Sequence, residues 1–210
     1  MKIPTLFPRW QKRRILLALF CACLSVLLIG LIVVLSARIH ERQATREADK
    51  LLDAAVEQYC DGSFDSASNA LTEAIAFLDL NKGSISAYCA RVQKNVPGQD
   101  RNVSIHYNFG LMEFNAHSML AYMMMCSRDT NQALLYLSCA YEYYKQGTER
   151  AHNAPTPRAP FVSFIIKQRD GADKANGVKW RSKLKLDPTV ANSIQAAWVG
   201  GPPNPGGLSQ

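Results

Sequence analysis

Thiol and imidazole side chains offer this sequence its clearest route to catalysis. Cys89 or Cys126 could pair with His106 or His117, because an imidazole that accepts the thiol proton leaves a thiolate nucleophile. The same cysteines are explained more simply as core residues or as disulfide partners. The sequence contains no GxSxG, no glycine-rich phosphate loop and no HExxH. We therefore expect a protein that is not an enzyme, with an uncharacterised periplasmic enzyme as an alternative.

The spacing of the cysteines and histidines does not suit a metal site. None of the six cysteines forms a CxxC pair, so nothing supports a zinc ribbon, a thioredoxin-like redox site or c-type haem attachment. The four histidines are not spaced as ligands relative to the cysteines or the acids. We expect no metal and no cofactor.

The net charge of +7 is concentrated at the two ends of the chain. Residues 148–210 carry nine basic and four acidic groups, whereas residues 51–147 carry six basic and ten acidic groups. This distribution argues against a uniformly basic surface for nucleic acid, so no nucleic-acid partner is expected.

An apolar segment near the N-terminus must anchor whatever follows it. Residues 15–37 contain no charge and, as a helix, span roughly 34 Å, enough to cross a bilayer. A cleaved secretory signal is the rival interpretation, but the segment exceeds the roughly 7–15 residues of a signal core. We expect a single-pass helix in the bilayer. The positive-inside rule favours a cytoplasmic N-terminus at residues 1–14 and a C-terminal domain in a periplasm-like compartment.

Four basic residues continue from the anchor at a spacing of four. Arg38, Arg42, Arg46 and Lys50 form one basic stripe if the membrane helix continues outward, and no proline or glycine interrupts it before Asp61. Such a stripe could meet anionic lipid head groups or an acidic partner. It could also be a solvated face of the stem.

Residues 38–147 predict a stem and a helical domain. They contain few helix breakers apart from Pro97 and Gly98. Small residues recur in this block with the same internal spacing, 66 positions apart. The first set is Ala55, Ala67 and Ala74, and the second is Ala121, Ala133 and Ala140. The helices expected after the anchor cover residues 38–59, 64–80, 84–94, 103–126 and 131–145.

This pattern resembles a degenerate tetratricopeptide repeat. Ala67-x3-Leu71-x2-Ala74 and Ala133-x3-Leu137-x2-Ala140 are similar to the second helix of that repeat, and Gly62-x-Phe64 is similar to its turn. The opening Trp and closing Pro of the family are missing, and residues 81–110 do not match. The resemblance covers about 64 of the 210 residues. A generic bundle of four or five helices is the alternative.

The resemblance implies a protein-binding face on the first helix of each pair. The residues at those positions are Leu52, Val56, Tyr59, Asn115, Ser118 and Tyr122. They could equally belong to the core. The repeat also makes Cys60 equivalent to Cys126, so a disulfide between them is conceivable in an oxidising compartment.

The C-terminal part predicts a linker at residues 148–160 and a small ββα unit at residues 161–200, before a flexible end at 201–210. Residues 161–168 are rich in β-formers, residues 169–177 would form the hairpin loop, and residues 178–186 alternate strictly. Asp187 would cap a helix over residues 188–199. One strand face holds Val178, Trp180, Leu184 and Leu186, and the basic face holds Lys179, Arg181, Lys183 and Lys185.

The basic strand face has three interpretations. It could be a solvated edge that prevents aggregation, a docking surface for an acidic partner, or a surface that packs on the acidic block 51–147. Taken together, the sequence predicts a mainly α, membrane-anchored protein that is not an enzyme. It would serve as an interaction scaffold, as an accessory or assembly subunit that binds other membrane proteins. A purely structural subunit without a ligand groove is the alternative.

Overall fold

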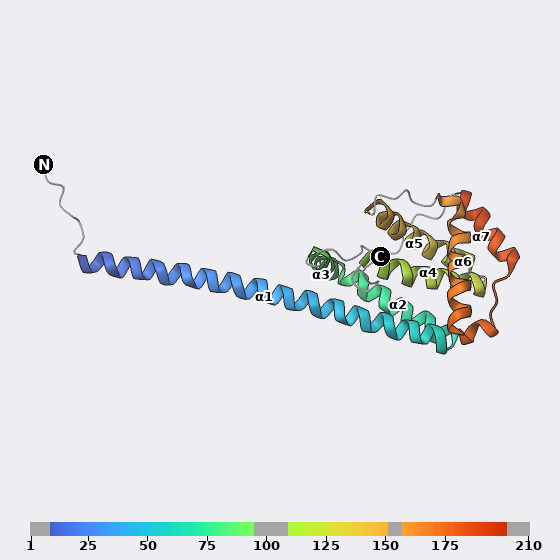
Figure 1. The fold of residues 1–210 in the computed structure, drawn as a ribbon, viewed down its shortest axis with the longest axis horizontal. Coiled ribbons are helices and arrows are strands. Elements are labelled where there is room, and N and C mark those ends of the chain that lie inside the picture. The colour runs from blue at the N-terminus through green and yellow to red at the C-terminus, as the bar shows by residue number, and fades with distance from the viewer. Residues whose placement is uncertain (1–8, 95–108, 151–156, 201–210) are drawn as a thin grey trace.

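The computed structural model describes residues 9–94, 109–150 and 157–200, and this part of the chain is helical (Figure 1). The expected helix over 103–126 is present from Phe109, and residues 103–108 lie outside the described part, as do residues 151–156 of the expected linker and the two ends. The elements are α1 (Arg9–Asp61), α2 (Phe64–Leu80), α3 (Lys82–Lys94), α4 (Phe109–Ser127), α5 (Thr130–Arg150), α6 (Arg158–Asn176), η2 (Lys179–Ser182) and α7 (Pro188–Gly200).

The first helix, α1, joins the apolar segment to the folded domain without interruption. It is 53 residues long, which corresponds to about 80 Å at 1.5 Å per residue. Its apolar part is long and apolar enough to cross a membrane, and the rest of the chain leaves those side chains uncovered. In Figure 1 this part projects away from the folded domain, while the end of α1 lies against α2.

Two helical hairpins, α1–α2 and α4–α5, form the centre of the domain. Gly62 is required in the first turn, because a Cβ there would lie 2.6 Å from the Gln58 carbonyl oxygen. Ser63 then caps α2 by accepting a hydrogen bond from the Ser66 amide at 3.2 Å. In the second hairpin Asp129 accepts a hydrogen bond from the Gln132 amide at 3.0 Å. Small buried residues line the helix contacts in both hairpins: Ala55, Ala67, Ala74, Ala121, Ala133 and Ala140.

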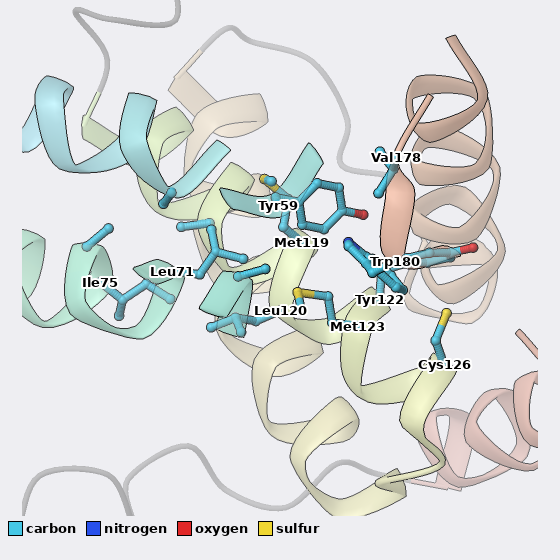
Figure 2. Packing of buried hydrophobic residues seen from close by; sticks show 14 residues of the cluster. Tyr59, Leu71, Ile75, Met119, Leu120, Tyr122, Met123, Cys126, Val178 and Trp180 are labelled. Carbon is cyan, nitrogen blue, oxygen red and sulfur yellow. The ribbon is translucent and has the colours of Figure 1, made fainter. Parts of the chain in front are cut away.

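The buried residues form three neighbouring clusters. The first joins α1, α2 and α4 to η2, and Figure 2 shows Tyr59, Tyr122 and Trp180 close together within it. The second joins α4 and α5 to α6 and α7, around Phe161 and Trp198. The third joins α1, α2, α3 and α4. Because α4 contributes to all three, it is the central helix of the domain.

The predicted β-hairpin at residues 161–186 is wrong, since the described residues contain no strand. The β-forming side chains of residues 161–168 lie in α6, where Phe161, Val162 and Ile165 are fully buried at helical spacing. Burial against other helices outweighs the β propensity of these residues. The helix ends at Gly177, whose φ of 63° is the left-handed conformation that terminates many helices.

The alternating segment after Gly177 turns instead of extending. The Trp180 carbonyl oxygen accepts hydrogen bonds from the Lys183 and Leu184 amides at 3.0 and 3.1 Å, which closes a short 3-10 turn. Val178 and Trp180 are nevertheless buried, so part of the predicted apolar face meets the core. The last predicted helix is confirmed as α7, whose Thr189 amide donates to Asp187 at 2.9 Å.

Candidate functional site

The six residues predicted to bind a partner do not form one open surface. Tyr59, Ser118 and Tyr122 are buried, whereas Val56 is exposed. Leu52 and Asn115 are half-buried. Partner binding therefore stays a prediction only for the residues that solvent reaches.

The chain's own C-terminal segment covers Tyr59. The Tyr59 hydroxyl donates to both carboxylate oxygens of Asp173 at 2.9 Å. Trp180 packs edge-on against Tyr59 and Phe64, with ring centroids 5.4 and 5.8 Å apart. Burial, together with the charge of Asp173, raises the pKa of Tyr59 far above its ordinary value, so the hydroxyl remains a donor.

Tyr122 is covered in the same way by the neighbouring turn of α6. Its hydroxyl donates to Asp170, and the Arg181 guanidinium lies 5.0 Å from the centre of its ring. Arg181 also pairs with Asp170 at 2.9 Å and with Asp173 at 3.5 Å. Burial raises the pKa of Asp173, and the Tyr59 hydroxyl and Arg181 oppose that shift. These contacts fasten α6 and η2 to α1 and α4.

Replacing Tyr59 with phenylalanine is expected to lower the free energy of unfolding by about 1.5–3 kcal/mol, the usual loss for a hydrogen bond to a charged group. Urea unfolding of the full chain in detergent, followed by circular dichroism, measures it. Tyr88→Phe is the matched control, because half-buried Tyr88 makes no hydrogen bond among the described residues. Equal stability of the two variants would show that the Asp173 contact contributes nothing.

The predicted basic strand face does not exist, because its four residues point in different directions from a turn. Lys179 pairs with Asp61 at 2.9 Å, which is a contact with the acidic block. Arg181 is turned inward toward Asp170 and Asp173. Lys183 and Lys185 are exposed.

The predicted basic stripe of the stem lies on an exposed face of α1. Arg38, Arg42, Arg46 and Lys50 are all exposed, and Lys50 pairs with Glu47 at 3.4 Å. The opposite face is buried in the domain at Ala44, Thr45 and Ala48. The stripe therefore remains open to lipid or to an acidic partner.

An open groove lies between α6 and α7, at a place that the sequence did not indicate. One hollow of about 650 Å³ is bounded by α6, the turn at η2 and the start of α7. A second of about 410 Å³ continues it, and the two share Ile166, Asp170 and Ala191. We call them together the α6–α7 groove. The only pattern in the sequence that could have pointed to it is helical spacing on one face of α6, at Ser163, Ile166, Lys167, Asp170 and Lys174.

A buried acid and a buried imidazole face each other on α4. The Glu113 carboxylate and the His117 Nε2 are 3.7 Å apart, and neither Glu113 oxygen has a hydrogen-bond partner within the described part of the chain. Burial, followed by the charge of Asp79, raises the pKa of Glu113 to about 8, against the opposing effect of Lys82. Burial lowers the pKa of His117 to about 4. At neutral pH both groups are therefore uncharged.

The Cys126–His117 pair considered from the sequence is not supported by this arrangement. Cys126 and His117 are nine residues apart on α4, a separation of about 13 Å along the helix. Burial raises the pKa of Cys126 to about 11 and raises that of Cys89, so both remain protonated thiols at neutral pH. Cys60 and Cys126 are free, and His106 lies outside the described residues. In the described ranges no three metal-binding side chains converge.

Comparison with known proteins gives no relative for this chain. It matches no protein-family model, no curated protein and no solved structure. Its function must therefore be inferred from its own residues and their geometry.

Proposed function

We propose that this protein is a membrane-anchored scaffold without enzymatic activity that holds another protein, as an accessory or assembly subunit of a membrane complex. The observation that carries the proposal is the continuity of α1. One helix supplies both the uncovered apolar segment and part of the domain core, at Ala44, Ala48, Ala55 and Tyr59.

A continuous helix fixes the height and direction of the domain. Residues 38–61 of α1 extend about 36 Å beyond the apolar segment, and the domain packs along most of that length. The Glu41–Arg91 ion pair ties α3 to α1 close to the anchor. A domain held in this way cannot swing freely, which suits a subunit that positions a partner at a set distance from the bilayer.

The repeated helical hairpins also support a scaffold. Both hairpins bury small residues at corresponding positions, with Leu71 and Leu137 fully buried beside them. Small residues allow two antiparallel helices to approach closely, as in tetratricopeptide-like domains. We therefore include in the proposal both the resemblance to the tetratricopeptide repeat and the protein-binding function that this resemblance implies.

The proposal includes a cytoplasmic N-terminus and an external domain. The short segment before the anchor carries five basic groups and no acid, which favours its retention in the cytoplasm. In intact cells, a membrane-impermeant thiol reagent should label a Glu73→Cys variant, because this side chain is exposed on α2. Labelling that occurs only after lysis would show that the domain lies in the cytoplasm.

The chain itself covers much of the predicted binding face, and this favours a second candidate function. In that alternative the protein is a structural subunit with no ligand groove along α1 and α4. Tyr59 and Tyr122 are both bonded to carboxylates of α6. A Val56→Glu change on the exposed side of α1 separates the two candidates. Loss of a co-purifying partner would place binding on this helix face, whereas retention would favour the structural role or binding elsewhere.

Purification from native membranes in mild detergent tests the scaffold proposal. We expect the full chain to bring down one protein in a fixed ratio. The matched control lacks residues 1–37, which removes the high effective concentration that a shared bilayer provides, so it should recover at most a tenth as much partner. Recovery of the full chain alone would contradict the proposal.

A further inference from the structure

We propose that the α6–α7 groove is the docking site for an acidic segment of the partner protein. This inference rests on the proposed function, since it assigns a surface and a chemistry to the partner that the scaffold holds. The groove is open to solvent, and no other part of the described chain fills it.

The floor of the groove is apolar, and its size suits several side chains. Ile166, Val178, Leu186, Pro188 and Ala191 supply the apolar surface. The two hollows, of about 650 and 410 Å³, are each within the range of ligand-binding clefts. An occupant therefore needs apolar side chains that cover this floor.

The charge around the groove selects an acidic occupant. The two carboxylates at its edge, Asp170 and Asp173, are already engaged by Arg181. Lys167, Lys174 and Lys185 are exposed at the rim, and within the described residues none of them makes an ion pair. The helix α7 carries no charged side chain that could balance them. With Arg181 included, the lining holds four cationic and two acidic side chains, so the groove has a formal net charge of +2 around an apolar floor.

Position and composition favour a protein segment over lipid or nucleic acid. The turn at η2 is fixed to the end of α1 by the Lys179–Asp61 pair, about 36 Å from the apolar segment. That distance exceeds the roughly 8 Å screening length at physiological salt, so the anchor's own bilayer does not reach the groove electrostatically. None of the described residues that line it is aromatic, whereas single-stranded nucleic acid would need aromatic rings for base stacking.

Peptide binding to the purified full chain in detergent tests the proposal. The probe is a fluorescein-labelled peptide of about 12 residues built from leucine and glutamate, and its polarisation reports binding. The variant K167E/K174E/K185E should bind it at least about tenfold more weakly, because three exposed ion pairs are lost and three like charges take their place. The neutral variant K167Q/K174Q/K185Q should be intermediate.

The control variant R42E/R46E/K50E makes the same change in net charge on the exposed stripe of α1. It should bind the peptide within about twofold of the wild-type protein. All six substituted side chains are exposed, so circular dichroism should show unchanged helix content. Equal weakening by both triple variants, or no binding by the wild-type protein, would overturn the assignment.

Photocrosslinking in native membranes distinguishes failure of the groove from failure of the scaffold. A benzophenone amino acid at position 191 should capture the partner, whereas the same group at position 73 on α2 should not. A co-purifying partner that crosslinks from position 73 but never from position 191 would overturn the groove and leave the scaffold intact. Absence of any partner would overturn the scaffold, and the peptide measurement would still decide whether the groove binds acidic segments.

Discussion

A Glu113→Gln variant is expected to have the same free energy of unfolding at pH 6.5 and at pH 8.5. Over the same range the free energy of unfolding of the wild-type protein should fall by about 2 kcal/mol. Glu113 is fully buried, and burial raises its pKa to about 8 from an ordinary value of 4.5. Through this pH range Glu113 is already ionised in the unfolded chain, whereas in the folded chain it holds its proton until about pH 8. The unfolded state therefore becomes more favourable relative to the folded state as the pH rises, and the free energy of unfolding falls.

The contribution of His117 to the free energy of unfolding changes with pH in the opposite direction, and it does so at lower pH. Its pKa is about 4 when folded, against an ordinary 6.5, so the unfolded chain binds the proton first as the pH falls. Its contribution is present above pH 6.5 and is lost toward pH 4. Between about pH 4.5 and 6.5 the two slopes cancel, so the maximum of stability should lie there.

Urea unfolding across this pH range measures the Glu113 effect as the difference between wild type and variant. Glu142→Gln on α5 is the matched control, since Glu142 is exposed and should leave the wild-type slope unchanged. Parallel curves for the wild type and Glu113→Gln would show that the carboxyl group is already ionised in the folded protein.

A Trp198→Ala variant is expected to lose about 3–5 kcal/mol of unfolding free energy, the usual cost of removing a buried aromatic ring. Trp198 is fully buried and packs against Phe161 and Tyr141, with ring centroids 5.9 and 5.8 Å apart. Its indole N–H donates to the Arg158 carbonyl oxygen at 2.7 Å. One side chain therefore joins α7 to both α6 and α5.

Val199→Ala is the control for Trp198, because the adjacent Val199 is 60% exposed. It should change the free energy of unfolding by less than about 0.5 kcal/mol. Thermal unfolding of both variants in the same detergent provides the comparison. A Trp198→Ala protein as stable as Val199→Ala would mean that α7 does not contribute to the cooperative core.

The helices of the N-terminal half could be predicted because their signals are local. A charge-free run, the lack of proline and glycine between Arg38 and Asp61, and the Gly62–Ser63 turn are all visible in the sequence. The structure has α1 and α2 at those places. In each case one stretch of chain contains the whole signal.

The β-hairpin that the sequence predicts over residues 161–186 is wrong because the signal that decides this region is not local. Phe161, Val162 and Ile165 favour a strand by propensity, but they form a helix because α5 and α7 provide apolar surfaces to pack against. The alternation after Gly177 is partly real, since Val178 and Trp180 are buried and Lys179 is exposed. A strand also needs a neighbouring strand, and the described chain has none to offer.

The candidate sites depended on burial that the sequence could not supply. Glu113 and His117 are four residues apart, as a helical pair should be, but only the central position of α4 shows that both are buried. The sequence pattern predicts a strand for Lys167 and a loop for Lys174, whereas both lie on α6 and share one face of it. The α6–α7 groove could be recognised only after α6 and α7 were placed beside each other.

The mass of the particle extracted from native membranes tests the central claim most directly. We expect the full chain of 23.3 kDa to be part of a larger particle that contains a second protein in a fixed ratio. Native mass spectrometry in mild detergent would resolve the two components. A particle containing only this chain, or only multiples of it, would contradict a membrane-anchored scaffold that holds another protein.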